Sequence, residues 1–105
     1  MSTKLDFDVD RLLRGAAELL RDGKQWGQGS GQNGATYCMM SALSEASFHG
    51  RLRFETYSLA LARLGFASPL DGVHWNDVPG RTVDEVIARL EGAVRADVVE
   101  VTNGD

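Results

Sequence analysis

Cysteine, proline and long apolar runs are all scarce in this sequence. The single cysteine, Cys38, excludes an intrachain disulfide and a zinc site built from cysteines. No apolar run approaches the roughly 20 residues of a membrane helix. The acidic N-terminus lacks the basic and then apolar pattern of a signal peptide. These absences predict a cytoplasmic protein that has no membrane segment.

Basic residues are also in the minority. The chain holds 11 lysines and arginines against 15 acidic residues, so its formal net charge is −4 at pH 7. This charge disfavours non-specific binding to nucleic acid. Hydrophobic residues make up 43% and charged residues 25%, a composition typical of a folded globular protein. A length of 105 residues leaves room for one domain. We therefore expect residues 1–105 to form a single domain, with residues 1–7 and 98–105 frayed.

The first part of the chain carries the clearest helical pattern. Apolar residues recur there at i, i+4 and i+7, namely Leu12, Ala16 and Leu19. Asp6 or Asp8 can cap the start of this helix, and Gly23 can end it. Asp10 and Arg14 are four residues apart and are expected to pair on its outer face.

Three further helices are predicted downstream. Thr36 caps one that ends at Gly50, and the next covers residues 51–64. Thr82 and Glu85 form a capping box, which predicts the start of the last helix. In the 51–64 helix, Phe54, Tyr57, Leu61 and Leu64 are spaced to share one helical face. The predicted core draws on all four helices: Leu12, Leu19, Leu43, Tyr57, Leu61, Ile87 and Leu90.

Two loops separate these helices. Residues 24–35 form a glycine-rich loop, and residues 29–34 within it fit the pattern Gly-x-Gly-x-x-Gly. A helix precedes this pattern where a nucleotide-binding fingerprint needs a strand, so a flexible surface loop is favoured. Prolines and glycines over residues 66–81 predict a second loop, with a short extended piece at residues 73–75. The fold class predicted is all-α, a compact four-helix domain.

Three segments resemble a known family. They are Trp26 after the first helix, residues 37–43 (Tyr-Cys-Met-Met-Ser-Ala-Leu) and residues 75–82 (Trp-Asn-Asp-Val-Pro-Gly-Arg-Thr). Their types and order resemble an uncharacterised family of actinobacteria and their phages, whose members carry a Trp-Cys-x-x-Gly-Ala segment and a Trp-Asn-Asp segment. Tyr37 and Ser41 depart from the usual Trp and Gly. The resemblance implies no known activity and favours a bacterial or phage accessory protein.

The Trp-Asn-Asp segment has two interpretations. In the structural one, Trp75 enters the core while Asn76 and Asp77 tie the loop to the last helix, because such side chains readily bond nearby backbone. In the functional one, Trp26 and Trp75 form the walls of a pocket whose polar contacts are Asn76, Asp77 and Arg81. Small-ligand pockets usually have this composition.

Cys38 also has two interpretations. At the second position of a helix, its thiol would be favoured as the nucleophilic thiolate, with His74 as base and Asn76 or Asp77 as the residue that orients it. Alternatively, Cys38 belongs to a stripe of small residues with Ala42 and Ala46, where a second helix packs closely. His74 and Asp77 lack a third ligand at a suitable spacing, so no metal site is predicted.

The leading hypothesis is a non-enzymatic binding or protein-interaction module without a cofactor. Its partner is an unknown protein or small molecule, and homodimerisation is an alternative that the sequence leaves open. A second hypothesis is a hydrolase or transferase that depends on Cys38. A third is sequestration of a small anionic ligand or nucleotide. Arg51, Arg53 and Arg81 could meet an anionic ligand or an acidic partner, or could simply be solvated.

Overall fold

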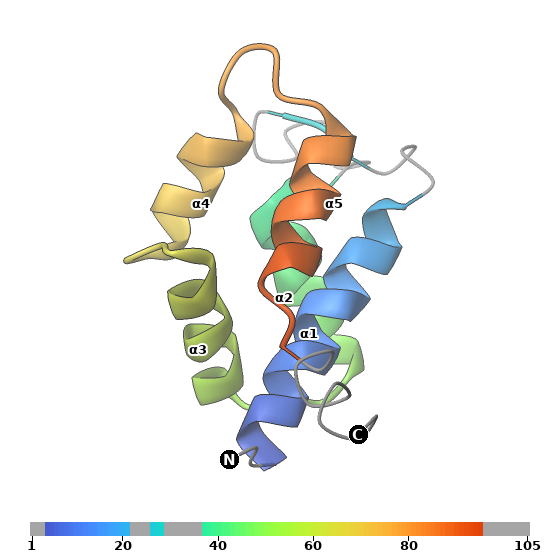
Figure 1. Ribbon diagram of the computed structural model, residues 1–105, viewed down its shortest axis with the longest axis vertical. Coiled ribbons are helices and arrows are strands. Elements are labelled where there is room, and N and C mark those ends of the chain that lie inside the picture. Colours follow the sequence, from blue (N-terminus) through green and yellow to red (C-terminus); the bar gives the residue numbers. More distant parts are fainter. Residues whose placement is uncertain (1–3, 22–25, 29–36, 96–105) are drawn as a thin grey trace, which may run out of the picture.

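The computed structural model describes residues 4–21, 26–28 and 37–95 (Figure 1). Within these ranges the chain is all-α without strands, which confirms the predicted fold class. The predicted number of helices is wrong, because there are five: α1 (Lys4–Leu20), α2 (Met39–His49), α3 (Phe54–Leu64), α4 (Pro69–Asn76) and α5 (Val83–Gly92). None of these described helices combines the length and the apolarity needed to cross a membrane.

Helix α1 is central and packs against α2, α3 and α5 (Figure 1). Its buried apolar side chains recur at helical spacing: Val9, Leu12, Leu13, Ala16, Ala17 and Leu20. Burying one such leucine completely contributes about 1.5–3 kcal/mol, so this face supplies much of the core's stability. Because Lys4 is already helical, Asp6 and Asp8 do not cap the helix as predicted. The predicted stop at Gly23 lies outside the described residues.

Small residues line the contact between α1 and α2. Ala42 is fully buried, and Ala46 packs against the core cluster. A Cβ placed on Gly15 of α1 would lie only 3.3 Å from the Cβ of Ala46. The two backbones can come this close because neither side chain is larger than a methyl group. The predicted packing role of the small residues of α2 is therefore confirmed for positions 42 and 46.

Helix α4 occupies part of the segment predicted as a loop, and the extended piece expected at residues 73–75 is helical. Pro69 stands in its first turn, where a missing backbone N–H removes no helical hydrogen bond. Gly72 lies inside the helix, and a Cβ there would come within 2.8 Å of Met40 Cγ and would overlap Met40 Sδ. The glycine therefore lets α4 pack against α2. Both residues resemble helix breakers in the sequence, which explains the wrong prediction.

Helix α5 begins at the predicted capping box. Glu85 N donates to Thr82 Oγ1 (3.2 Å), and Thr82 N donates to Glu85 Oε1 (2.9 Å). These bonds satisfy backbone donors that the first turn leaves without helical partners.

Most of the predicted core is buried, namely Leu12, Leu43, Leu61, Ile87 and Leu90. The exceptions are Leu19 and Tyr57, which are only partly buried.

A buried ion pair connects α1 to α3. Asp10 is 5% exposed and accepts hydrogen bonds from Arg63 and from the backbone N–H of Arg95 (3.0 Å). Arg63 also donates to the carbonyl of Ala93 (3.1 Å), so this cluster fixes the end of α5 as well. The predicted surface pair of Asp10 with Arg14 is therefore wrong. Removing one partner of a buried pair of this kind typically costs about 3–5 kcal/mol.

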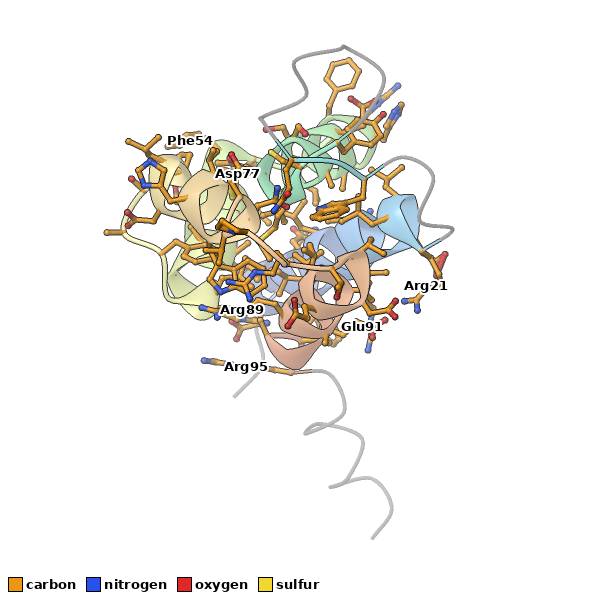
Figure 2. All side chains as sticks on the ribbon, turned by 90° about the horizontal axis from the view of Figure 1, so that it is seen from above. Arg21, Phe54, Asp77, Arg89, Glu91 and Arg95 are labelled. Atoms are coloured by element: carbon orange, nitrogen blue, oxygen red, sulfur yellow. The ribbon has the colours of Figure 1, made fainter. Side chains whose placement is uncertain are left out.

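An exposed ion pair joins the end of α1 to α5. Arg21 donates to Glu91, and in Figure 2 the two labelled side chains lie side by side. The hydrogen bond that Arg21 donates to Glu91 and the negative charge of Glu91 raise the pKa of Arg21. Because both side chains are about half exposed (48% each), solvent screens this pair and its contribution to stability is small.

The turn between α2 and α3 contains a strained residue. Arg51 has a φ of 54°, a left-handed conformation that costs a non-glycine residue about 1 kcal/mol. Its N–H donates to Phe48 O (3.1 Å), and Leu52 N donates to Ser47 O (3.0 Å). This bond pair is the usual helix termination in which the left-handed position holds glycine. Gly50 stands one position earlier, where a Cβ would lie 3.2 Å from Leu52 Cγ. The corner is thus tightly folded.

Candidate functional site

Asn76, the last residue of α4, is fully buried, and its side-chain amide is completely hydrogen-bonded. Its Oδ1 accepts from Trp26 Nε1 (2.7 Å) and from the backbone N–H of Met39 (3.0 Å). Its Nδ2 donates to Gly27 O (3.2 Å) and to Asp77 Oδ1 (3.0 Å). An asparagine amide has two donors and one oxygen with two acceptor sites, so all are used. Asn76 therefore connects three segments that are distant in the sequence.

The bond to Met39 also caps α2 from outside. The first backbone N–H groups of a helix have no acceptor within the helix, and Asn76 supplies one. Cys38 is the N-cap, and its Sγ accepts from Ser41 N (3.5 Å) while Ser41 Oγ accepts from Cys38 N (2.8 Å). The expected cap at Thr36 lies outside the described residues. The start of α2 thus depends on a thiol of its own and on an amide from α4.

Residues 26–28 are bound to Tyr37, just before α2, and to the end of α4. Trp26 forms an isolated parallel bridge with Tyr37, and Gly27 N donates to Tyr37 O (3.0 Å). Gln28 Nε2 donates to the carbonyls of Asn76 (3.0 Å) and Val78 (2.9 Å). We call the group formed by Trp26, Gln28, Cys38, Asn76 and Asp77 the Asn76 brace. Nothing in the sequence singled out Gln28, because a glutamine within a glycine-rich loop is usually a solvated residue.

Trp75 is partly buried, and arginine side chains contact its ring. The Cζ atom of Arg81 lies 3.7 Å from the ring centroid, and Arg81 Nε donates to Trp75 O (3.0 Å). Arg89 lies 5.0 Å from the same ring and 5.1 Å from that of Phe66, and its Nη2 donates to Leu64 O (2.6 Å). A cation over an aromatic face is stabilising, most of all when desolvated. Both guanidinium groups are therefore engaged within the fold.

The five residues predicted to form a binding pocket are thus placed in two internal clusters. Trp26, Asn76 and Asp77 share hydrogen bonds, and Trp75 stacks with Arg81. The donors and acceptors of Asn76 are already used by the chain itself. As in the structural interpretation, the segment bonds its own chain, but Asn76 ties residues 26–27 and the start of α2 rather than the last helix, and Trp75 is only partly buried.

The structure does not assemble the predicted nucleophile and base. Cys38 is 3% exposed, and it is the N-cap of α2 rather than its second helical residue, so that prediction is wrong. His74 is exposed on α4, and no hydrogen bond between described residues joins it to Cys38. Asp77 Oδ1 accepts from Asn76 Nδ2 (3.0 Å). The Gly-x-Gly-x-x-Gly stretch at residues 29–34 lies outside the described part of the chain.

Metal ligands are not clustered in what the structure describes. Across residues 4–21, 26–28 and 37–95, no group of three histidine, cysteine, aspartate or glutamate side chains is placed to hold an ion. His74 and Asp77 do not belong to such a group among the described residues.

Comparison with known proteins places the chain in a family. The model of a family of unknown function (DUF6197) matches residues 5–96. The chain belongs to this family. No curated protein and no solved structure gives a significant match. Membership in DUF6197 agrees with the resemblance to an uncharacterised family, while the actinobacterial or phage origin and the family motifs remain predictions.

The surface feature that the sequence did not predict is the corner between α2 and α3 of this DUF6197 chain. Phe48 is 78% exposed, and Phe54, which the sequence placed on an apolar helical face, is 80% exposed. Together with Leu52, Tyr57 and Arg51 they line an open hollow of about 590 Å³. We call this set the corner face. Figure 2 shows Phe54 at the outer edge of the molecule. Two phenylalanines on either side of Gly50 were the available signal.

Proposed function

We propose that the chain is a non-enzymatic protein-interaction module and that it binds its partner through the corner face. The observation that carries this proposal is the exposure of Phe48 (78%) and Phe54 (80%) around one hollow. Scattered single apolar side chains are normal on protein surfaces, but contiguous apolar patches with a polar rim mark interaction sites. Ser44, Ser47 and Arg51 form part of such a rim.

Hydrogen bonds also close the turn that carries the corner face. Its aromatic residues lie on the last turn of α2 and the first turns of α3, and the bonds of Arg51 N and Leu52 N close the turn between them. The rings of Phe54 and Tyr57 lie 6.4 Å apart, so they present a joint aromatic surface. A surface that is ordered before binding loses less conformational entropy when the partner arrives, which favours affinity.

The Asn76 brace supports the same proposal indirectly. The thiol of Cys38 and the side-chain amide of Asn76 accept hydrogen bonds from backbone N–H groups in the first turn of α2. Both groups therefore stabilise the start of this helix. A bond network of this kind positions α2, and therefore Phe48, relative to α4. In this proposal the Trp-Asn-Asp segment keeps the scaffold rigid while the partner binds at the other end of α2.

Affinity capture from cells of the source organism tests the proposal. The full-length chain is the bait, and the double variant F48S/F54S is compared with the matched control F7S/L70S, whose wild-type residues are 53% and 59% exposed. We expect specific proteins on the wild type and on the control, and their loss on F48S/F54S. Equal capture by both double variants, with circular dichroism showing that both are folded, would contradict the proposal.

A further inference from the structure

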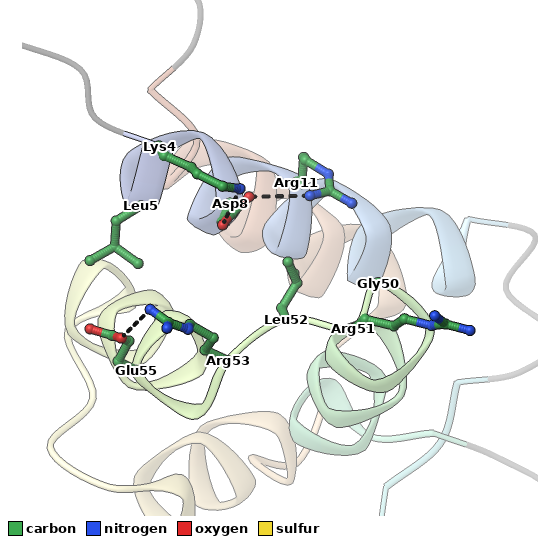
Figure 3. Close-up of a pocket in the computed structure, with 9 residues that line it drawn as sticks. All are labelled: Lys4, Leu5, Asp8, Arg11, Gly50, Arg51, Leu52, Arg53 and Glu55. Carbon is green, nitrogen blue, oxygen red and sulfur yellow. Dashed lines mark hydrogen bonds and ion pairs between the residues drawn. The ribbon is translucent and has the colours of Figure 1, made fainter.

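We infer that the corner face recognises an acidic amphipathic segment of a partner protein, one that places carboxylates beside apolar anchors. This inference rests on the proposed function and names the chemistry of the partner. It comes from a second hollow that adjoins the corner face, between the start of α1 and the start of α3 (Figure 3).

The second hollow is basic although the whole chain is acidic. Four cations and two anions line it: Lys4, Arg11, Arg51, Arg53, Asp8 and Glu55. These charges sum to +2, whereas the chain as a whole carries −4. A local excess of positive charge attracts carboxylates, speeds the encounter and disfavours basic partners.

Arg51 is the cation best placed to bind a carboxylate. The other three cations of the hollow already have acidic neighbours: Lys4 and Arg11 lie 3.4 and 3.1 Å from Asp8, and Arg53 lies 3.2 Å from Glu55. Arg51 is exposed and forms no ion pair with any described residue. It also holds the left-handed backbone position that glycine usually takes. Non-glycine residues with a positive φ are concentrated at functional sites, which agrees with a binding role for Arg51.

The apolar and basic parts form one continuous surface. Arg51 and Leu52 line both hollows. Figure 3 shows the side chains of Arg51 and Arg53 extending to opposite sides of Leu52, so cations flank the apolar centre of the corner. A helical or extended segment with apolar side chains near Phe48 and Phe54 would bring its neighbouring carboxylates within reach of these arginines.

A partner protein fits this surface better than a second copy of the chain does. A twofold dimer would present the same patch to itself and would bring Arg51 and Arg53 near their own copies, which is unfavourable. An anionic membrane surface would also meet the carboxylates of Asp8 and Glu55, which stand among the cations. Discrete carboxylates on a peptide can avoid those two acids.

Selection from a random peptide display library tests the inference on the full-length chain. We expect the wild type to enrich peptides that have a net negative charge and at least two apolar anchors. One enriched peptide is then titrated against the wild type, R51A/R53A and the control R14A/R95A, whose wild-type arginines are exposed and away from the corner. Loss of two exposed ion pairs should weaken binding by about 2- to 30-fold in R51A/R53A. The control should keep the wild-type affinity.

Other outcomes would overturn the inference. Enrichment of neutral or basic apolar peptides whose binding needs Phe48 and Phe54 contradicts the charge preference and leaves the proposed interaction face standing. Absence of any peptide that depends on Phe48 or Phe54, together with unchanged capture by F48S/F54S, contradicts both. Binding to phosphatidylglycerol vesicles without acidic peptides, or dimerisation lost in F48S/F54S, assigns the face to a membrane or a second copy.

Discussion

Asn76 offers the most informative single perturbation of this fold. Asn76→Ala removes four hydrogen bonds at once. One of them is the bond that Met39 N–H donates, and because Met39 is 0% exposed, water cannot replace the lost acceptor. A buried donor left unsatisfied costs about 1–3 kcal/mol. Trp26 and Gly27 are only partly buried, so water can replace some of their lost bonds. We therefore expect a loss of roughly 2–4 kcal/mol in the free energy of unfolding.

Urea unfolding followed by circular dichroism measures this loss. A domain of this size has a total stability of about 5–15 kcal/mol, so the variant should remain folded with a clearly lower midpoint. His74→Ala is the matched control, because this side chain is exposed on the same helix, and it should change stability by less than about 0.5 kcal/mol. The control also removes the imidazole that the hydrolase hypothesis requires.

A double-mutant cycle with Trp26→Phe isolates the bond between the indole and the amide. Trp26 Nε1 and Asn76 Oδ1 are 2.7 Å apart, so the two substitutions should be coupled by at least about 0.5 kcal/mol. If Asn76→Ala unfolds within about 0.5 kcal/mol of the wild type, or if the coupling is absent, the idea that this amide holds three segments together is refuted.

Three further substitutions test other parts of the fold, each by the same unfolding assay. Gly72→Ala should destabilise by about 1–3 kcal/mol despite the better helix propensity of alanine, because the new methyl group collides with Met40; a stabilised variant would contradict the close packing of α4 on α2. Arg51→Gly should stabilise by about 0.5–1 kcal/mol, because glycine adopts a positive φ without strain. Thr82→Ala should lose about 1 kcal/mol as the bond to Glu85 N disappears, and no loss would show that the capping box is unimportant.

The predictable part of the fold comes from local patterns. The apolar periodicity around Leu12 and the capping box at Thr82 both depend on residues a few positions apart, so the sequence alone indicates α1 and the start of α5. The sequence did not predict α4, because Pro69 and Gly72 usually interrupt helices but do not do so here. Proline is tolerated in a first turn, and the glycine provides room for Met40, which is 32 residues away in the chain.

The candidate site was predicted only in part for a similar reason. The sequence pointed to Asn76 as a notable residue, but its partners Trp26 and Met39 lie 50 and 37 residues away. Whether an asparagine binds a ligand or its own chain depends on such distant neighbours. Phe54 shares a predicted helical face with Leu61 and Leu64, which are buried, yet Phe54 itself is 80% exposed at the first position of α3.

Backbone amide NMR provides the most direct test of where this chain binds. The uniformly ¹⁵N-labelled protein is titrated with a captured partner or with an acidic peptide enriched by display. We predict that the largest shift changes fall on residues 47–57, around Phe48 and Phe54, while the Trp26 indole and the amides of residues 75–81 change little. Changes centred on Trp26 and residues 75–81, with the corner face unaffected, would contradict the proposed site and favour the pocket interpretation.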